Sequence, residues 1–356
     1  MARPIEFKTS VALALSGLDV SAKVLQGLVG REKPAGQHHM KYTPADLRTA
    51  RYRSAGLEML QDALPLDSPQ QMPPVIVTRM TKGGVGKTCV SVNTAVALAM
   101  MGYRVLVIDA DPQATASNLL GIESSFDTSI KHIGHFLIRK SGEPDRDLSE
   151  SILSIYEGGF LDLLPSDITL AETDASLVAA MASHERVLVF LKRNSSYFSQ
   201  RYDVIVVDTA PGTTPVALAF TYAAKEAGKI LTVVEPEGSC LRALESLASN
   251  LAEIKAVTGA NVGMEIVVNR YHPSMKHVRE SMGYLYAKYS GSLYDSIIPQ
   301  YSGFARQINS VSRETVPLVE AEPSSVGATA VIDVTKALIH SYGITHPGLS
   351  LAKEVV

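Results

Sequence analysis

The sequence predicts an α/β fold: a doubly wound, mostly parallel β-sheet with helices on both faces, preceded by a small helical module. From Pro73 onward, short runs rich in valine, isoleucine and leucine alternate with loops and with alanine- and leucine-rich stretches of helical character. These runs are too continuously apolar for a sheet with one face in water, so we expect strands buried between two layers of helices. The runs are "VIVTRM", "RVLVIDAD", "FLDLLPSD", "YDVIVVDTAPG", "KILTVVEPEG", "MEIVVNRY" and "SLYDSIIPQ".

Length and composition limit the remaining choices. The chain has 356 residues, 46% of them hydrophobic, which suffices for one large α/β domain with an appendage. A net charge of -3 argues against a surface that coats nucleic acid and leaves room only for a local basic patch. Cys89 and Cys240 lie far apart without metal or disulfide spacing, which is typical of a reduced cytoplasmic protein. No apolar run reaches the roughly 18 residues of a membrane span, so we expect no membrane contact.

Residues 1–72 have a different pattern from the rest. Two helical stretches, 10–30 and 43–64, are separated by "REKPAGQHH" and followed by a linker containing prolines. Basic residues outnumber acidic ones between Arg31 and Arg53, so the second helix either contacts DNA or packs on the main domain with a solvated face. The sequence favours neither interpretation. The main domain is expected over 73–343, and 344–356 is expected to be a frayed tail.

Polar loops follow four of the predicted strands. In sequence order they are "TKGGVGKT", "DADPQ", "DTAPG" and "NRYHP". Ligands of doubly wound sheets bind at the carboxyl ends of the strands. We therefore expect these loops to converge on one edge of the sheet and to form the functional site there.

The first of these loops has the composition of a phosphate-binding loop. Its glycines permit a tight turn whose N–H groups point at phosphate oxygens, and the following helix adds its N-terminal dipole. Lys87 would pair with the β- and γ-phosphates, and the Thr88 hydroxyl would bind Mg²⁺. The nucleotide-binding residues predicted here are Lys82, Gly83, Gly84, Val85, Gly86, Lys87, Thr88 and Cys89.

The loop departs from the general G-x-x-x-x-G-K-[ST] pattern, because Thr81 replaces the first glycine and a second lysine, Lys82, follows it. "KGGVGKT" resembles the deviant Walker A motif of the family that includes ParA-type partition ATPases, MinD and the nitrogenase iron protein. The resemblance covers residues 73–343 and implies a P-loop NTPase that uses ATP and Mg²⁺. It also implies that Lys82 reaches the nucleotide held by a partner subunit, so that ATP links a sandwich homodimer.

The same resemblance assigns the acidic residues. Asp111 in "VLVIDADPQ" matches the residue that orients the attacking water, and the predicted catalytic residues are Lys82, Lys87 and Asp111. Asp208 in "VIVVDTAPG" matches the Walker B aspartate that holds Mg²⁺ through water, and Asp109 would support the metal site from behind. Pro211 and Gly212 would belong to the switch loop that senses the γ-phosphate.

Two later segments would complete the nucleotide site. By resemblance, Asn269 and Arg270 read the adenine edge, and Pro299 in "IIPQYSGFARQ" marks the segment that closes over the base. An asparagine after a strand is also an ordinary turn residue, so both interpretations of Asn269 stay open.

Taken with the N-terminal extension, these motifs look most like the larger ParA partition ATPases, whose helix-turn-helix module binds operator DNA. The resemblance implies an ATP-dependent, nucleoid-associated dimer that binds DNA non-specifically and hydrolyses ATP weakly until a centromere-binding ParB-type partner stimulates it. The alternative is a positioning ATPase whose cargo is a protein assembly. Basic residues on later helices would contact DNA phosphates. The candidates are Lys276, Arg279, Arg306 and Arg313.

Two other roles within the family are disfavoured by the sequence. MinD-like membrane positioning needs a basic amphipathic C-terminal helix, and "GLSLAKEVV" is short and poor in charge. An iron-protein role needs cysteines in cluster-binding loops, which Cys89 and Cys240 do not match. The wording "DTAPG", however, is closer to MinD and the iron protein than to the "D-x-P-P" of many partition ATPases.

Overall fold

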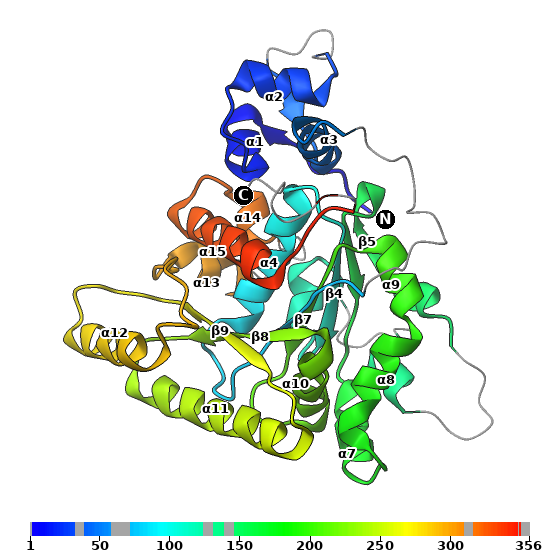
Figure 1. Ribbon diagram of the computed structural model, residues 1–356, viewed down its shortest axis with the longest axis vertical. Helices are drawn as coiled ribbons and strands as arrows, with labels where there is room; N and C mark the ends of the chain where they lie inside the picture. The colour runs from blue at the N-terminus through cyan, green and yellow to red at the C-terminus, as the bar shows by residue number, and fades with distance from the viewer. Residues whose placement is uncertain are drawn as a thin grey trace.

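The computed structural model describes residues 2–32, 39–57, 72–123, 131–138, 146–309, 316–347 and 349. Its centre is a seven-stranded sheet in the order β5-β6-β4-β7-β3-β8-β9, parallel except for the β5-β6 pair (Figure 1). The predicted α/β class is confirmed. The strands are β3 Val75–Thr78, β4 Val105–Ala110, β5 Leu153–Tyr156, β6 Leu161–Leu164, β7 Val204–Thr209, β8 Gly228–Val234 and β9 Gly263–Val268.

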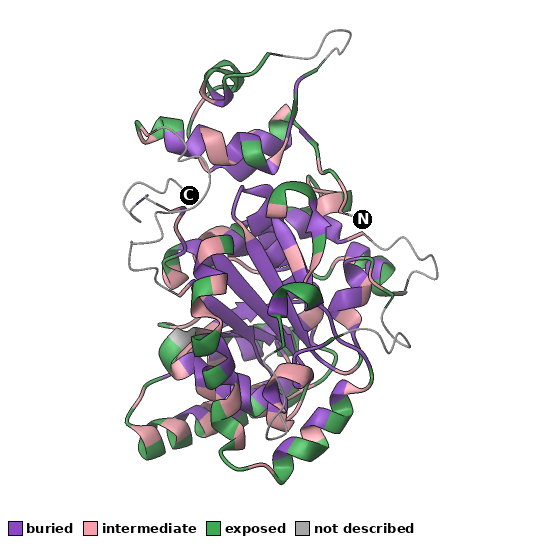
Figure 2. Ribbon diagram, turned by 90° about the vertical axis from the view of Figure 1, so that its right-hand side faces the viewer, coloured by how far each residue is buried: buried purple, intermediate pink, exposed green. Residues whose placement is uncertain are grey.

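Helices cover both faces of this sheet, and Figure 2 shows the strands buried between them. In β4, Val105 and Val107 pack in one apolar cluster with α4 and α15, whereas Leu106 and Ile108 pack in the other with α8 and α10. This alternation explains the continuously apolar strands. The helices are α4 Lys87–Met100, α5 Thr115–Leu119, α6 Gly134–Leu137, α7 Leu170–Val178, α8 Arg186–Arg193, α9 Ser195–Arg201, α10 Pro215–Ala227, α11 Gly238–Thr258, α12 Lys276–Tyr289, α13 Ser302–Asn309, α14 Leu318–Ala321 and α15 Val326–Tyr342.

Six of the predicted strand runs are strands, and one is not. The run "SLYDSIIPQ" makes only isolated bridges, Leu293 to Ile266 and Pro299 to Tyr271, so it follows the edge of β9 without forming a continuous ladder. Proline lacks the N–H that such a ladder needs. The antiparallel strand β5 was not predicted, because its four residues are too few for a clear alternation.

The N-terminal module contains α1 Thr9–Ser16, α2 Ala22–Val29 and α3 Pro44–Ser54, with a two-stranded sheet of β1 Phe7–Lys8 and β2 Lys41–Tyr42. The predicted helix 10–30 is wrong as a single element, because Gly17 ends α1 in the left-handed region and Ser21 caps a new helix. The predicted helix 43–64 begins as expected at Thr43, which forms a capping box with Asp46, but its predicted end is wrong, because the helix ends at Ser54 and residues 55–57 are not helical. Residues 58–64 lie outside the described residues.

The α3 helix packs on the main domain through its basic side chains. The Arg48 guanidinium donates to Asp203 Oδ2 at 2.6 Å and to the Gly102 carbonyl at 2.9 Å. Burial alone would raise the pKa of Asp203, but Arg48 and Arg104 hold it at about 2. A Cβ at Gly102 would lie 2.8 Å from the Arg48 backbone nitrogen, so the contact requires glycine. The contacts of α3 therefore support the interpretation that this basic helix packs on the main domain, rather than the interpretation that it contacts DNA.

The part of the C-terminal segment that the structure describes is buried rather than frayed, so the expectation for the tail is wrong there. Ile344 and His346 are buried, and the His346 ring stacks on Tyr103 with ring centroids 4.1 Å apart. The Tyr52 hydroxyl of α3 donates to the Pro347 carbonyl. The C-terminal segment thus contacts both the main domain, through Tyr103, and the N-terminal module, through Tyr52. No helix in the described ranges is long and apolar enough to cross a membrane.

Candidate active site

The glycine-rich loop connects β3, near the middle of the sheet, to α4, which begins at Lys87. Gly84 and Gly86 have φ of 80° and 89°, a region that favours glycine. A Cβ at Gly86 would lie 2.4 Å from the Asn269 amide nitrogen, so glycine is also needed for space. The N–H groups of the first turn of α4 are free of intrahelical partners by geometry, as an anion site at a helix start requires.

Lys87 and Asp208 lie together under this loop. Lys87 is 6% exposed, and burial lowers its pKa, while Asp208 and Asp111 oppose that shift. Asp208 is near the end of β7, where it pairs in register with Thr78 of β3 and Asp109 of β4. The parallel strands thus bring the loop lysine and the acidic residues to one sheet edge, as predicted.

The Asp208 carboxylate has the properties expected of a metal-site residue. Its Oδ1 accepts a hydrogen bond of 2.8 Å from the Ser91 hydroxyl, whereas its Oδ2 is buried without a hydrogen-bond partner in the described part of the chain. Burial raises its pKa to about 6, and the Thr88 hydroxyl and Lys87 oppose the rise. A buried carboxylate oxygen without a partner, beside a threonine hydroxyl, fits a Mg²⁺ ion bound directly or through water.

Asp109 lies within β4 and Asp111 directly follows it, and the surroundings of the two residues differ. Asp109 accepts hydrogen bonds at Oδ2 from the Ser117 backbone at 2.8 Å and from its hydroxyl at 2.7 Å, so this oxygen is occupied in holding α5. Burial and the nearby Asp208 raise the pKa of Asp109 to about 7. Asp111 accepts from the Gln113 N–H at 2.9 Å and is close enough to Lys87 and Asp208 to affect their pKa values. Asp109 is fully buried, whereas Asp111 keeps a small exposed fraction, and the roles predicted for the two residues remain predictions.

The switch loop after Asp208 touches the phosphate loop directly. The Gly212 N–H donates to the Thr81 carbonyl at 3.0 Å, and Pro211 lies within van der Waals reach of Gly83. Gly212 has φ of 81°, which favours glycine. A backbone hydrogen bond and a side-chain contact thus connect the two loops.

Lys82 forms its ion pair with a residue outside the phosphate loop. Its ammonium forms an ion pair with the Glu237 carboxylate, which precedes α11 and also accepts from the Ser239 hydroxyl at 2.6 Å. The side chains are 31% and 36% exposed, so the pair is at the surface. Glu237 was missed by the sequence analysis, since no local pattern links it to a lysine 155 residues earlier.

The two segments predicted to enclose the base lie side by side. The Tyr271 N–H donates to Ile298 at 3.1 Å, and the Gln300 N–H donates to Tyr271 at 3.1 Å, which places Pro299 against the loop of Asn269 and Arg270. Asn269 is buried, and its amide nitrogen donates to the Val85 carbonyl at 2.9 Å. This contact leaves the Asn269 side-chain carbonyl as the atom that would accept from an adenine amino group.

Other predicted residues lie outside the centre of the site. The Cys89 thiol is buried against Gln307, and burial raises its pKa to about 11, so only the backbone of Cys89 can face a phosphate. Lys276 and Arg279 are exposed on α12. This helix lies near α11, beyond the edge strand β9 (Figure 1). Arg306 pairs with Glu322 at 2.8 Å. Arg313 lies outside the described residues.

Sequence comparisons give this site a family. A family profile described as an AAA domain matches residues 74–265. The cell division protein PomZ of Myxococcus xanthus is 30% identical over 253 residues, which are 70% of this chain and 73% of PomZ. The sporulation initiation inhibitor protein Soj of Bacillus subtilis is 26% identical over 267 residues, which are 74% of this chain and 96% of Soj.

Solved structures share the fold. A complex of a Cyanothece McdA variant with ATP matches with a TM-score of 0.63 at 17% identity, covering 78% of this chain and 100% of McdA. The MinD cell division protein of Aquifex aeolicus matches with a TM-score of 0.56 at 24% identity, covering 77% of this chain and 98% of MinD. Together with the phosphate loop, its two lysines and the acidic strand ends, these matches place the chain in the ParA/MinD family of P-loop proteins.

Proposed function

We propose that the protein is a partition ATPase whose ATP-bound form is a sandwich dimer. The observation that carries this proposal is the division of the two loop lysines. Lys87 is buried beside Asp208 in its own site, whereas Lys82 forms an ion pair at the surface with Glu237. A partly exposed lysine of this kind would be available for the phosphates of a second subunit, where a charge-assisted contact is worth most.

Within one subunit, different residues would bind the phosphates, hold Mg²⁺ and orient the attacking water. The loop N–H groups and Lys87 would bind the β- and γ-phosphates of ATP, and Thr88 with Asp208 would hold Mg²⁺, which neutralises charge on the phosphate oxygens. Asp111 would accept a hydrogen bond from the attacking water and fix its direction. Because phosphoryl transfer asks mainly for positioning and charge stabilisation, these few residues suffice for a weak ATPase.

The ATP-bound dimer is proposed to bind DNA non-specifically, and so to be located on the nucleoid. A ParB-type partner is proposed to stimulate ATP hydrolysis and the release of the dimer from DNA. The names of relatives support partition or positioning in general, since they include Soj, PomZ, McdA and a plasmid partition protein of Borrelia burgdorferi. The second candidate, a positioning ATPase for a protein cargo, is favoured by PomZ, which is described as a cell division protein.

Replacing Lys276 and Arg279 by alanine tests the DNA proposal. Both are exposed on α12, and the Lys276–Glu280 pair at 3.6 Å is exposed as well, so it holds Lys276 only weakly. We expect weaker binding to all DNA sequences, and a slope of log affinity against log salt that falls by about 1 for each lost phosphate contact. The measurement is a salt titration of ATP-dependent DNA binding.

Lys192→Ala is the matched control, because Lys192 is an exposed cation on α8, on the other side of the molecule. It should keep the wild-type salt slope. An unchanged slope in the α12 double variant would place the DNA surface elsewhere. A wild-type protein that binds no DNA with ATP present would favour the protein-cargo alternative.

Glu237→Gln should promote dimerisation. The substitution removes the negative charge that holds Lys82 in its own chain, while the side chain keeps its size. Because the pair is partly exposed, we expect a modest effect, about two- to fivefold tighter ATP-dependent self-association. Sedimentation at several protein concentrations measures it, with Glu245→Gln, in the helix α11 that Glu237 precedes, as control. Weaker self-association would indicate that Glu237 helps to form the dimer instead.

A further inference from the structure

Arg79 is a buried cation that the proposed chemistry does not use. It directly follows β3 in the centre of the sheet, and its exposed fraction is 0%. Its guanidinium donates from Nε to the Thr221 hydroxyl at 2.8 Å, from Nη1 to the Ala210 carbonyl at 3.3 Å and from Nη2 to the Gly212 carbonyl at 3.0 Å. In the described part of the chain no carboxylate lies within ion-pair distance of it.

Packing alone does not explain why an arginine occupies this buried position. Burying a guanidinium without a counter-charge costs free energy that an apolar side chain of similar length would avoid. Burial lowers the pKa of Arg79 to about 10, so it stays charged at neutral pH. What arginine offers instead is a rigid fork of donors that can hold several acceptors in fixed relative positions.

The acceptors that it holds belong to the switch loop. Ala210 and Gly212 flank Pro211, and only Thr209 separates this segment from Asp208. The N–H of Gly212 is bonded to Thr81 of the phosphate loop, and its carbonyl is bonded to Arg79. Gly212 is therefore fixed on one side by the phosphate loop and on the other by a side chain from the strand that carries that loop.

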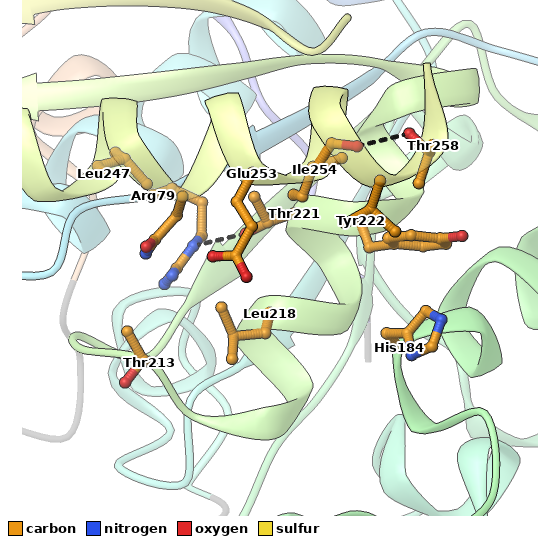
Figure 3. A pocket seen from close by; sticks show the side chains of 12 residues that line it. Arg79, His184, Thr213, Leu218, Thr221, Tyr222, Leu247, Glu253, Ile254 and Thr258 are labelled. Atoms are coloured by element: carbon orange, nitrogen blue, oxygen red, sulfur yellow. Dashed lines mark hydrogen bonds between the residues drawn. The ribbon is translucent and has the colours of Figure 1, made fainter. Parts of the chain in front are cut away.

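The third partner of Arg79 connects this loop to a helix. Thr221 lies within α10, where its hydroxyl also donates to the Ala217 carbonyl at 2.8 Å. Arg79 and Thr221 line a pocket of about 360 Å³ between α10 and α11, with Leu218 and Ile254 on its walls (Figure 3). Arg79 is therefore fully buried and borders this cavity on the side of α10 and α11.

We propose that Arg79 is a positioning residue for hydrolysis, which holds the switch loop in register with the phosphate loop and couples both to α10. The inference rests on the proposed ATPase function and adds a residue to it. Burial lowers the pKa of Lys87, and the nearby charge of Arg79 adds to this lowering, which places the Arg79 charge close to the phosphate loop. Without the fork, ATP would still bind through Lys87, but the switch loop would be misplaced for the reaction.

The test compares Arg79→Met, which removes charge and fork, with Arg79→Lys, which keeps the charge alone. For Arg79→Met we expect kcat for ATP hydrolysis to fall at least about tenfold while the Kd for a fluorescent ATP analogue stays within about threefold. Arg79→Lys should recover only part of the rate. Lys225→Met, which removes a cation elsewhere on α10, should leave both quantities unchanged.

A second readout follows the switch loop directly. The chain contains no tryptophan, so Thr213→Trp places a single fluorophore at an exposed position of this loop. In this background ATP should change the emission when Arg79 is present and should change it much less with Arg79→Lys or with Thr221→Val. If Arg79→Met fails to fold, these two milder variants decide the question through the same signal.

Wild-type kcat and a wild-type emission change in the Arg79 variants would overturn the proposal. So would a variant that only lowers the unfolding temperature while turnover per folded molecule is normal. If the wild type itself binds ATP without hydrolysing it, the proposed function fails, and the emission change alone then decides whether Arg79 positions the loop.

Discussion

Lys82→Ala should bind ATP and remain a monomer under conditions in which the wild type becomes a dimer. Under the proposal the buried Lys87 would supply the phosphate contact within each subunit, so loss of Lys82 should leave nucleotide affinity nearly unchanged. A symmetric dimer loses two charge-assisted contacts, each worth about 1.5–3 kcal/mol. Together these correspond to roughly 10²- to 10⁴-fold weaker self-association, the largest effect expected of any single substitution here.

Light scattering with saturating ATP measures the mass of this variant, and binding of a fluorescent ATP analogue measures nucleotide affinity. Lys87→Ala is the matched control, because it alters the other lysine of the same loop and should lose nucleotide binding itself. A Lys82→Ala protein that dimerises normally with ATP would show that the first loop lysine does not act across the interface.

Asp111→Ala should have the opposite effect on assembly. The carboxylate is buried, is fixed by the Gln113 N–H at 2.9 Å and lies near Lys87 and Asp208. If it only orients the attacking water, its removal leaves ATP, Mg²⁺ and the dimer contacts in place and lowers turnover by about 10²-fold or more. The dimer should then persist, because hydrolysis no longer separates the subunits.

The lifetime of the dimer after removal of free ATP measures this effect. Asp111→Asn keeps an oxygen that can accept from Gln113, so it separates the loop contact from the role of the negative charge. An Asp111→Ala protein that stays monomeric with saturating ATP would mean that Asp111 is needed for assembly. Two variants that both lack turnover but differ in mass cannot result from a general defect of the phosphate loop.

Much of the fold and of the site centre could be predicted because the signals are local. A glycine-rich loop between an apolar strand and a helix specifies a phosphate cradle within eight residues, 81–88. The strand-end aspartates Asp109 and Asp208 lie in register in the structure, since parallel strands align their carboxyl ends. Two predicted elements were wrong. The apolar run that contains Pro299 makes only isolated bridges instead of a strand, and Gly17 ends a helix in the middle of the stretch predicted as one helix.

The residues that sequence reasoning missed act through contacts distant along the chain. Arg48 of α3 meets an aspartate 155 residues later, and this contact decides that the basic helix packs on the main domain. Glu237 reaches Lys82 over the same separation, and Arg79 reaches Gly212 across 133 residues. No periodicity or motif encodes such pairs. Arg79 did offer one signal, because it is a charged residue immediately after the uncharged strand Val75–Thr78.

Wild-type mass as a function of nucleotide tests the central claim most directly. The monomer mass is 38.2 kDa, so light scattering separates a monomer from a dimer without ambiguity. The protein should have twice this mass with ATP and Mg²⁺, and the monomer mass with ADP or with no nucleotide. The same mass in all three conditions would contradict an ATP-linked dimer, and with it the role of Lys82.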